Sequence, residues 1–255
     1  MAKTALITGS TSGIGLSLAE SFAANGYNIT FNGLENDGAA TSEEIASRFG
    51  VGHLFSNTNM QDAKALRKLA DETVNTFGRL DVLINNAGIQ HISPIEDFPE
   101  QMWDAIVSIN LSAAFHLTKA VWPYMKSQHF GRIINIASVH GLVASENKSA
   151  YVAAKHGLIG FTKAAALEGA PFGIIANAIC PGFVRTALVQ NQIDLQVEAT
   201  GLSEPEVIEK LLRKHAVREF IPVAAITDMA LLLASENARS TTGAAFTIDG
   251  GWSAQ

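Results

Sequence analysis

The chain has 255 residues, of which 47% are hydrophobic and 16% are charged, and its formal net charge is −6. This composition is ordinary for a globular protein and can supply a large core, so we expect one domain over residues 1–255. The negative net charge argues against nucleic acid as the main partner, because phosphate binding depends on Lys and Arg. The single cysteine, Cys180, excludes an intramolecular disulfide and any cysteine-based metal cluster.

The N-terminus runs directly into the apolar segment Thr4–Thr8, without the basic region, long apolar stretch and cleavage site of a signal peptide. No apolar run reaches the roughly 18 residues that a membrane-spanning helix needs. The sequence therefore predicts a cytoplasmic protein that does not use a membrane.

Short segments rich in β-branched residues alternate with helical patterns along the chain. The predicted strands are Thr4–Thr8, Asn28–Asn32, His53–Ser56, Val82–Asn86, Arg132–Ala137, Ile174–Ile179 and Ala245–Ile248. The predicted helices are Ile14–Asn25, Gly38–Phe49, Asp62–Phe77, Gln101–Met125, Ser149–Gly169 and Val223–Ala234. Most of the strands are apolar without strict alternation, which is typical of a sheet with both faces covered. Repeated β-α units of this kind predict an α/β fold with a doubly wound parallel sheet of about seven strands.

A polar helical insertion, from Ala187 to about Glu219, interrupts the alternation before the last predicted strand. We call residues 187–219 the lid segment. Because ligands bind at the carboxyl ends of strands in doubly wound sheets, this segment is well placed to cover a substrate. The alternative is a surface helix pair with no part in gating.

The first predicted strand runs into a turn with glycines at Gly9, Gly13 and Gly15, and a helix follows. Glycine permits the tight turn and lets backbone amides approach a pyrophosphate, and the helix N-terminus favours an anion. The glycine spacing is a weak signal alone, but its place on the first strand-to-helix turn predicts a dinucleotide site.

The end of the second predicted strand indicates which nicotinamide dinucleotide is bound. In such folds an acidic residue there binds the ribose 2′-hydroxyl, whereas Arg accommodates a 2′-phosphate. Here the segment runs from Asn32 to Glu35 without a basic residue, and the turn residues Ser10 to Ser12 are uncharged. This favours NAD over NADP.

Tyr151 and Lys155 are four residues apart on one predicted helix, so their side chains share a face. Ser138 closes the preceding predicted strand, and Asn110 lies inside the long fourth helix. Hydride transfer from an alcohol requires a base for the hydroxyl proton, and Tyr can act as one if its pKa falls from about 10 to near 7–8. The Lys155 ammonium and a positive nicotinamide ring would lower that pKa, and Ser138 would hold the substrate oxygen. The same Tyr–Lys spacing also arises by chance on solvated helix faces.

Taken together and in order, these motifs resemble the short-chain dehydrogenase/reductase family along essentially the whole chain. The matching motifs are Thr8-Gly9 with Gly13 and Gly15, Asn85-Asn86-Ala87-Gly88, Asn110, Ser138, Tyr151 with Lys155, Pro181-Gly182 and Asp249-Gly250-Gly251. The resemblance implies a Rossmann-type sheet and a catalytic set of Ser138, Tyr151 and Lys155, with Asn110 completing a proton relay. It also implies cofactor contacts from Gly9, Thr11, Ser12, Gly13, Ile14, Gly15, Asn32, Asn59, Met60, Asn86, Ala87, Gly88, Tyr151, Lys155, Pro181, Gly182, Val184 and Thr186.

Four polar residues, Gln90, His140, Lys148 and Gln192, fall near the predicted reaction centre without being needed for hydride transfer. Two cationic or donor groups and two amides suit a small carboxylate better than a sterol or a long acyl chain. Taken separately, Lys148 and Gln192 could equally be surface residues and His140 an ordinary loop histidine.

The stretches 86–91, 137–145, 147–156 and 249–252 resemble the D-3-hydroxybutyrate dehydrogenase branch of the family. That resemblance implies that these four side chains hold the substrate carboxylate, beside Ser138 and Tyr151 at the reacting oxygen. It implies further that Trp252 closes the apolar side of the pocket, that acetoacetate is the product and that the enzyme is a homotetramer.

Asn59 stands where this branch often carries Asp, and the lid segment and residues 215–228 match it poorly, so a larger 3-hydroxy acid is also considered. A second enzyme hypothesis is an NADPH-dependent 3-oxoacyl-thioester reductase, which would favour basic residues near positions 10 and 33–35. A hypothesis of another class is a non-catalytic dinucleotide-binding scaffold. The seven histidines show no ligand spacing, so no metal is expected.

Overall fold

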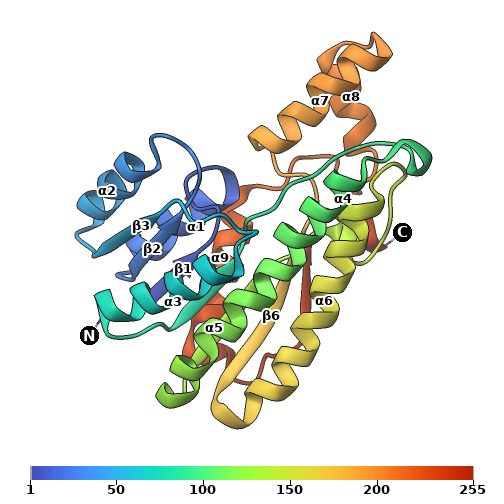
Figure 1. Cartoon of the computed structure of the whole chain (residues 1–255). Coiled ribbons are helices and arrows are strands. Elements are labelled where there is room, and N and C mark those ends of the chain that lie inside the picture. The colour runs from blue at the N-terminus through green and yellow to red at the C-terminus, as the bar shows by residue number, and fades with distance from the viewer. Residues whose placement is uncertain (1, 255) are drawn as a thin grey trace.

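Seven parallel strands form one sheet in a computed structural model that describes residues 2–254 (Figure 1). The strand order is β3-β2-β1-β4-β5-β6-β7, so the order reverses between β1 and β4. The strands are β1 (Thr4–Ile7), β2 (Asn28–Asn32), β3 (His53–Ser56), β4 (Val82–Asn85), β5 (Gly131–Ile136), β6 (Ile174–Pro181) and β7 (Ala245–Ile248). The predicted doubly wound parallel sheet is therefore confirmed.

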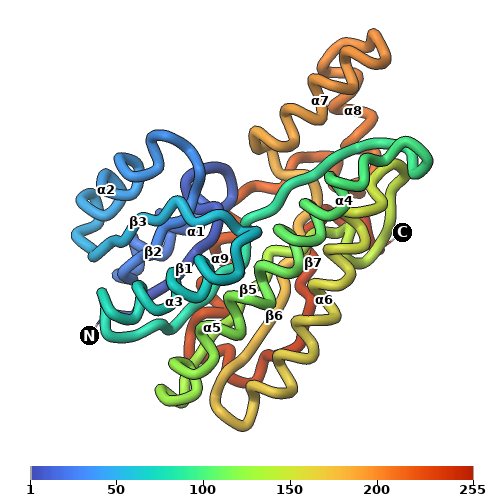
Figure 2. Tube along the Cα trace, in the orientation of Figure 1, coloured from blue at the N-terminus to red at the C-terminus, as the bar shows by residue number. Residues whose placement is uncertain are grey.

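Helices cover both faces of this sheet. They are α1 (Gly13–Ala24), α2 (Gly38–Phe49), α3 (Ala63–Phe77), α4 (Glu100–Val107), α5 (Ala113–Gln128), α6 (Ser149–Gly169), α7 (Ala187–Thr200), α8 (Glu204–Leu212) and α9 (Val223–Ala234). One layer holds α3, α5 and α6, which lie side by side in Figures 1 and 2, and the other face is covered by α1 and α9. One apolar cluster fills each interface, with Phe22 and Ile226 on one side and Leu69 and Leu117 on the other.

Three predicted strand ends are wrong by a residue. Thr8, Asn86 and Ala137 lie just beyond β1, β4 and β5 rather than within them. At this edge the chain leaves the ladder to form the turns of the cavity described below. In contrast, β6 continues two residues past the predicted Ile179, because Cys180 and Pro181 pair with β7.

The single helix predicted over Gln101–Met125 is wrong in its middle. A π-helical turn, Ser108–Ser112, separates α4 from α5 within one continuous helical run. The Asn110 side chain accounts for this turn, because its Oδ1 accepts from Ile89 N at 2.9 Å and its Nδ2 donates to Ile89 O at 2.9 Å. π-turns of this kind are frequently found at functional sites.

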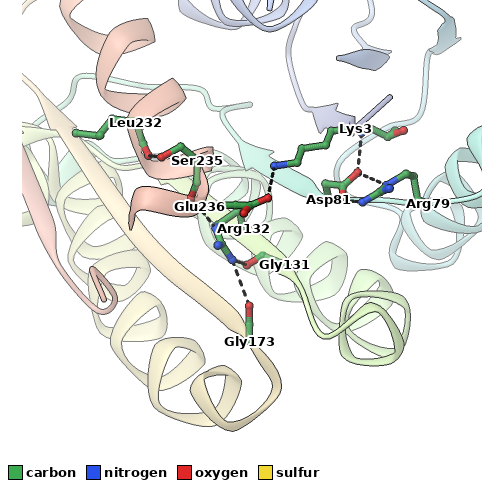
Figure 3. A network of polar contacts seen from close by, with 10 residues as sticks. Lys3, Arg79, Asp81, Gly131, Arg132, Gly173, Leu232, Ser235 and Glu236 are labelled. Carbon is green, nitrogen blue, oxygen red and sulfur yellow. Dashed lines mark hydrogen bonds and ion pairs between the residues drawn. The ribbon is translucent and has the colours of Figure 1, made fainter. Parts of the chain in front are cut away.

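The opposite, amino-terminal edge of the sheet is fastened by a polar network (Figure 3). Arg132 is only 4% exposed, and its guanidinium donates to the carbonyl oxygens of Gly131, Gly173 and Ser235 at 2.9, 3.2 and 3.3 Å. Next to it, Asp81 accepts from Thr4 N and from Arg79. Most of the polar groups drawn at this edge therefore bind one another.

The lid segment consists of α7 and α8, which project above the carboxyl edge of the sheet in Figure 1. Ser203 begins α8 with a capping box, since its amide donates to the Glu206 carboxylate at 2.8 Å. The apolar residues of the two helices pack on each other and on Phe183, which follows β6. The insertion predicted from Ala187 thus forms a helical hairpin above the site.

Candidate active site

A cavity of about 380 Å³ opens at the carboxyl edge of the sheet, where the strand order reverses. This is the position at which doubly wound sheets bind their ligands. The turn after β1, the loops after β2, β3, β4, β5 and β6 and the first turn of α7 line it.

The glycine turn shapes the part of this cavity next to β1. Gly9 and Gly13 have φ values of +60° and +54°, a backbone conformation that favours glycine. A Cβ on Gly15 would stand 2.0 Å from the Gly9 carbonyl oxygen, so only glycine lets α1 approach the turn this closely. The N-terminus of α1 therefore faces the cavity with no side chain from these three positions in between.

The Asn86-Ala87 loop is bound directly to the same turn. Thr8 Oγ1 accepts from the backbone amides of Asn86 and Ala87 at 2.9 and 3.0 Å, and Asn86 Nδ2 donates to Thr8 O at 2.9 Å. Asn32 supports the turn from β2, because its Oδ1 accepts from Gly9 N and its Nδ2 donates to the carbonyls of Ser56 and Thr58. The side-chain amide of Asn32 thus forms its hydrogen bonds with the backbone, although the residue lines the cavity.

Glu35 brings a carboxylate into the cavity beside the glycine turn. Its Oε2 accepts a short hydrogen bond from the Thr11 hydroxyl, and a Cβ on Gly33 would lie 1.8 Å from that hydroxyl. The hydrogen bond from Thr11 holds the pKa of Glu35 below its usual range. The carboxylate is therefore ionised at neutral pH, at the end of β2 where an adenosine ribose is expected.

These residues fit a nicotinamide dinucleotide. The glycine cradle and the N-terminus of α1 suit a pyrophosphate, and the cavity continues from Glu35 past the turn to Tyr151. Most of the cofactor contacts expected from the sequence line this cavity. They are Gly9, Ser12, Gly13, Ile14, Asn32, Asn59, Met60, Asn86, Ala87, Gly88, Tyr151, Lys155, Pro181, Gly182, Val184 and Thr186. Thr11 and Gly15 do not line it: Thr11 donates to Glu35, and Gly15 lets α1 approach the Gly9 carbonyl.

Ser138, Tyr151 and Lys155 meet at the inner end of the cavity. Ser138 lies two residues beyond β5, where its Oγ accepts from His140 N at 3.1 Å and so begins a 3₁₀ turn, Val139–Gly141. That turn packs on α6 at Gly141, where a Cβ would be 2.6 Å from Ile159. Tyr151 and Lys155 lie on the same face of α6, with the Lys155 Nζ 5.6 Å from the centre of the Tyr151 ring.

The electrostatics of this group differ from the sequence-based expectation. Burial raises the pKa of Tyr151, and a hydrogen bond from Ser138 opposes that rise. Burial also lowers the pKa of Lys155 to about 8, and its Nζ donates to Ile136 O at 2.8 Å. Desolvation therefore outweighs the hydrogen bond from Ser138, and the pKa of Tyr151 lies above its ordinary value, not below it as the sequence predicted.

Asn110 lies behind these residues rather than beside the substrate space. It lines a second cavity of about 10 Å³ together with Lys155, Asn85 and Thr8, which is close to the volume of one water. Its side-chain amide both accepts from and donates to the Ile89 backbone, and its expected part in a proton relay stays a prediction.

Gln90, Lys148 and Gln192 form a second polar cluster, next to Tyr151. The Lys148 Nζ donates to Gln90 Oε1 at 3.3 Å and to Gln192 Oε1 at 3.1 Å, and Gln90 Nε2 donates to the same Gln192 oxygen at 3.2 Å. Burial, followed by the charge of Lys214, lowers the pKa of Lys148 to about 8. These side chains close on one another instead of lining the larger cavity.

His140 and Trp252 stand between the two groups. The His140 ring lies edge-on to Tyr151 and to Trp252, with centroids 5.9 and 5.1 Å apart, and Trp252 stacks on Phe183. The ring nitrogens of His140 face Ser138 and Ser145 rather than Lys148. Burial, followed by the charges of Lys148, Lys214 and His156, lowers the pKa of His140 to about 3.

Within residues 2–254, no group of three or more His, Cys, Asp or Glu side chains is placed to hold a metal ion. None of the helices described in this range is both long and apolar enough to cross a membrane.

A family model described as short chain dehydrogenase matches residues 3–196, which include the glycine turn, Ser138, Tyr151 and Lys155. The chain belongs to this family. A short-chain dehydrogenase is an oxidoreductase that uses a nicotinamide dinucleotide, and both statements hold for this enzyme.

Two relatives share the whole length of this dehydrogenase. A D-beta-hydroxybutyrate dehydrogenase of Cupriavidus necator is 48% identical over 254 residues, which cover 99% of this chain and 98% of that protein. A D-beta-hydroxybutyrate dehydrogenase of Rhizobium meliloti is 45% identical over 258 residues, which cover all of both chains. Among solved structures, an actinorhodin polyketide ketoreductase with NADPH superposes with a TM-score of 0.94 at 29% identity, covering 100% of this chain and 98% of that one.

Sequence reasoning missed several residues of this dehydrogenase that line the larger cavity. They are Gly33, Leu34, Glu35, Thr58, Ile89, Ile109, Ile136, Ala137, Ala187, Leu188 and Val189. Glu35 was the one with a usable signal, since an acidic residue shortly after β2 is a known ribose ligand. The apolar residues carry no such signal, because their side chains resemble those of any core position.

Proposed function

We propose that this enzyme is an NAD-dependent dehydrogenase that interconverts D-3-hydroxybutyrate and acetoacetate. The observation that carries this proposal is the Lys148 ammonium, which is 6% exposed and is held by the oxygens of Gln90 and Gln192. Within residues 2–254, the ion pairs include none between Lys148 and a carboxylate. A buried cation without an anionic partner is costly, so the cluster favours a ligand that brings a carboxylate.

The surroundings of Lys148 favour a small acid. His140, Phe183 and Trp252 pack against one another beside it, and the Lys148 Nζ is 5.9 Å from the centre of the Phe183 ring. A carboxylate that binds Lys148 would replace the Gln192 oxygen, which lies on the lid helix α7. Binding would therefore change a contact that now holds the lid segment.

The residues at the inner end of the cavity have complementary parts in the reaction. Ser138 would donate a hydrogen bond to the substrate oxygen, and Tyr151 would remove the proton of the C3 hydroxyl as the C3 hydrogen leaves as hydride. Lys155, as an ammonium, would stabilise the tyrosinate. A bound nicotinamide ring supplies the hydride acceptor and a positive charge that further favours the ionised tyrosine.

The preference for NAD is supported by Glu35. Its carboxylate is ionised and lies in the cavity beside the glycine turn, where a 2′-phosphate would add a like charge at short range. An NADPH-dependent 3-oxoacyl-thioester reductase would have to bind the negatively charged 2′-phosphate beside the Glu35 carboxylate. A ribose 2′-hydroxyl can instead donate to the same carboxylate.

The first experiment follows NADH absorbance with each enantiomer of 3-hydroxybutyrate, and with acetoacetyl-CoA and NADPH as the competing substrate pair. We expect turnover of the D acid with NAD and little with the L acid. Turnover of the thioester with NADPH and none of the D acid would overturn the proposal. Tyr151→Phe should abolish turnover while NAD binding persists. Intact NAD binding with no turnover of any alcohol by the parent protein would favour a scaffold role.

A second experiment tests the carboxylate site alone. Lys148→Met should raise KM for D-3-hydroxybutyrate by about ten- to hundredfold, since a charge-assisted hydrogen bond is worth about 1.5–3 kcal/mol. The same variant should change KM for the neutral methyl ester of that acid much less. Lys210→Met, which removes an exposed lysine from α8, is the matched control. Equal loss for acid and ester would contradict a carboxylate site at Lys148.

We also propose a homotetramer. Apolar side chains that a monomer would leave in water are consistent with it, since Phe115 on α5, Leu167 on α6 and Leu232 on α9 are 45%, 79% and 54% exposed. Light scattering on purified protein should give four times the chain mass, and a monomer would contradict this part of the proposal.

A further inference from the structure

A line of polar contacts leads from the lid segment to the reacting serine. Lys214, which follows α8, donates from its Nζ to Ser145 Oγ at 2.9 Å. Ser145 Oγ is 2.9 Å from His140 Nε2, and His140 Nδ1 is 3.5 Å from Ser138 Oγ. Four side chains therefore connect the base of the lid to the hydroxyl that faces Tyr151.

The donors and acceptors at the outer end of this line show which way its hydrogen bonds run. An ammonium can only donate, so Lys214 uses a lone pair of Ser145 and leaves the serine proton available. Of the two groups that contact Ser145 Oγ, the imidazole is the one that can accept that proton. His140 is neutral, because burial and the charges of Lys148, Lys214 and His156 hold its pKa near 3. It can therefore carry one proton, on one nitrogen.

At the inner end of the line, the two tautomers of His140 would affect Ser138 in opposite ways. Ser138 Oγ already accepts from the His140 backbone amide at 3.1 Å, and the Ser138 hydroxyl lowers the pKa of Tyr151 by hydrogen bonding to it. If His140 Nδ1 carries the proton, Ser138 accepts from it and keeps its own proton for the reacting oxygen. If Nε2 carries the proton, Nδ1 instead accepts from Ser138 and draws that proton away.

We infer that Lys214 and Ser145 are positioning residues that hold His140 as its Nδ1–H tautomer, so that the Ser138 hydroxyl proton points at the substrate oxygen. This inference rests on the proposed function for the identity of that oxygen, although the tautomer itself does not. It gives His140 a part other than the carboxylate contact that the sequence resemblance implies. It also connects the position of the lid segment to the hydrogen bonding of Ser138.

Trp252 helps to fix the outer end of this line. The Lys214 Nζ lies 4.8 Å from the centre of the Trp252 ring, and the His140 ring is edge-on to the same indole. A cation over an aromatic face is attracted to it, so the indole keeps Lys214 near Ser145. Lys214→Met keeps the aliphatic contact with Trp252 and removes the donor, which makes it a suitable test of the hydrogen bond.

Neutron crystallography of deuterium-exchanged full-length protein, with and without NAD, reports the tautomer directly. We expect deuterium on Nδ1 of His140 and on Ser145 Oγ directed at Nε2. Deuterium on Nε2 would overturn the inference. This readout does not depend on which alcohol the enzyme oxidises, so a failure of the proposed substrate leaves the test intact.

Kinetics then test the effect on turnover, with whichever alcohol the enzyme oxidises. Ser145→Ala should lower kcat about tenfold and leave KM within about twofold, and Ser145→Thr, which keeps the hydroxyl, should restore kcat. Lys214→Met should lower kcat less, and the double variant should fall no further than Ser145→Ala, because Lys214 acts through Ser145. Lys210→Met is the matched control on α8.

Two kinetic results would overturn the inference. The first is an unchanged kcat in Ser145→Ala. The second is a higher KM for the acid in Lys214→Met, seen again in the double variant on top of the loss of kcat from Ser145→Ala. That result would make Lys214 a direct ligand of the carboxylate instead.

Discussion

The Lys148 Nζ, at the start of α6, donates to the Oε1 of Gln192 on α7 at 3.1 Å, so this hydrogen bond joins α6 to the lid segment. In the proposed reaction a substrate carboxylate takes the place of that oxygen. In that reaction the substrate would have to displace Gln192 from Lys148. A stronger contact between these two residues would therefore weaken substrate binding.

Gln192→Glu tests this exchange. A carboxylate at position 192 would pair with Lys148 permanently, so we expect a Tm higher by about 3 °C and a KM for D-3-hydroxybutyrate higher by at least about tenfold. Thermal unfolding and initial rates measure the two effects. Asn191→Asp, an exposed neighbour on α7, adds the same charge away from Lys148 and should show neither. A higher Tm with an unchanged KM would show that the substrate does not use Lys148.

The pKa of Lys148 predicts a pH dependence of substrate binding. Burial lowers this pKa from 10.5 to about 8, so the ammonium is lost as pH rises above about 8. KM for the acid should then increase by up to about tenfold per pH unit, while KM for the neutral methyl ester stays flat. Lys155, whose pKa is also lowered to about 8, would affect both substrates alike. The same rise in KM for the ester would therefore assign the change to Lys155.

The same pKa shift has a consequence for folding. Between about pH 8 and 10.5 the unfolded chain keeps the proton that folded Lys148 has released, so the free energy of unfolding increases with pH in that window. Lys148→Met should remove the share of this increase that belongs to Lys148. Urea unfolding at pH 8 and pH 10 measures it, and an identical pH dependence in both proteins would contradict the assignment.

Glu35 predicts how the cofactor preference can be changed. Glu35→Gln removes the charge but keeps the shape and the contact with Thr11, so kcat/KM with NADP should rise about tenfold while that with NAD changes little. Glu44→Gln, an exposed residue on α2, is the control of equal charge. An unaltered ratio of the two cofactors would mean that the 2′ position lies away from Glu35.

The sequence was sufficient to place Tyr151 beside Lys155, because helical periodicity alone puts residues four apart on one face. It also located the glycine turn, because a parallel sheet brings the carboxyl ends of its strands to one edge. Both predictions depend on regular geometry that every helix and sheet shares.

Other features depended on side-chain geometry that periodicity does not encode. The π-turn at Ser108–Ser112 follows from how the Asn110 amide meets the Ile89 backbone, two segments that only the folded chain brings together. The orientation of His140 toward two serines is equally non-local, since either ring nitrogen could have faced Lys148. The raised pKa of Tyr151 reflects burial, which a motif does not report.

Arg132 allows a test of stability at the edge of the sheet remote from the active site. Arg132→Met should lower the free energy of unfolding by about 2–3 kcal/mol and Tm by about 5–10 °C, because it removes the buried guanidinium that donates to the carbonyls of Gly131, Gly173 and Ser235. KM and kcat at 25 °C should remain close to those of the parent. Arg48→Met breaks an exposed ion pair with Glu20, which is worth at most about 1 kcal/mol, and serves as the control. Equal losses for the two variants would mean that the network in Figure 3 contributes no more than a surface ion pair.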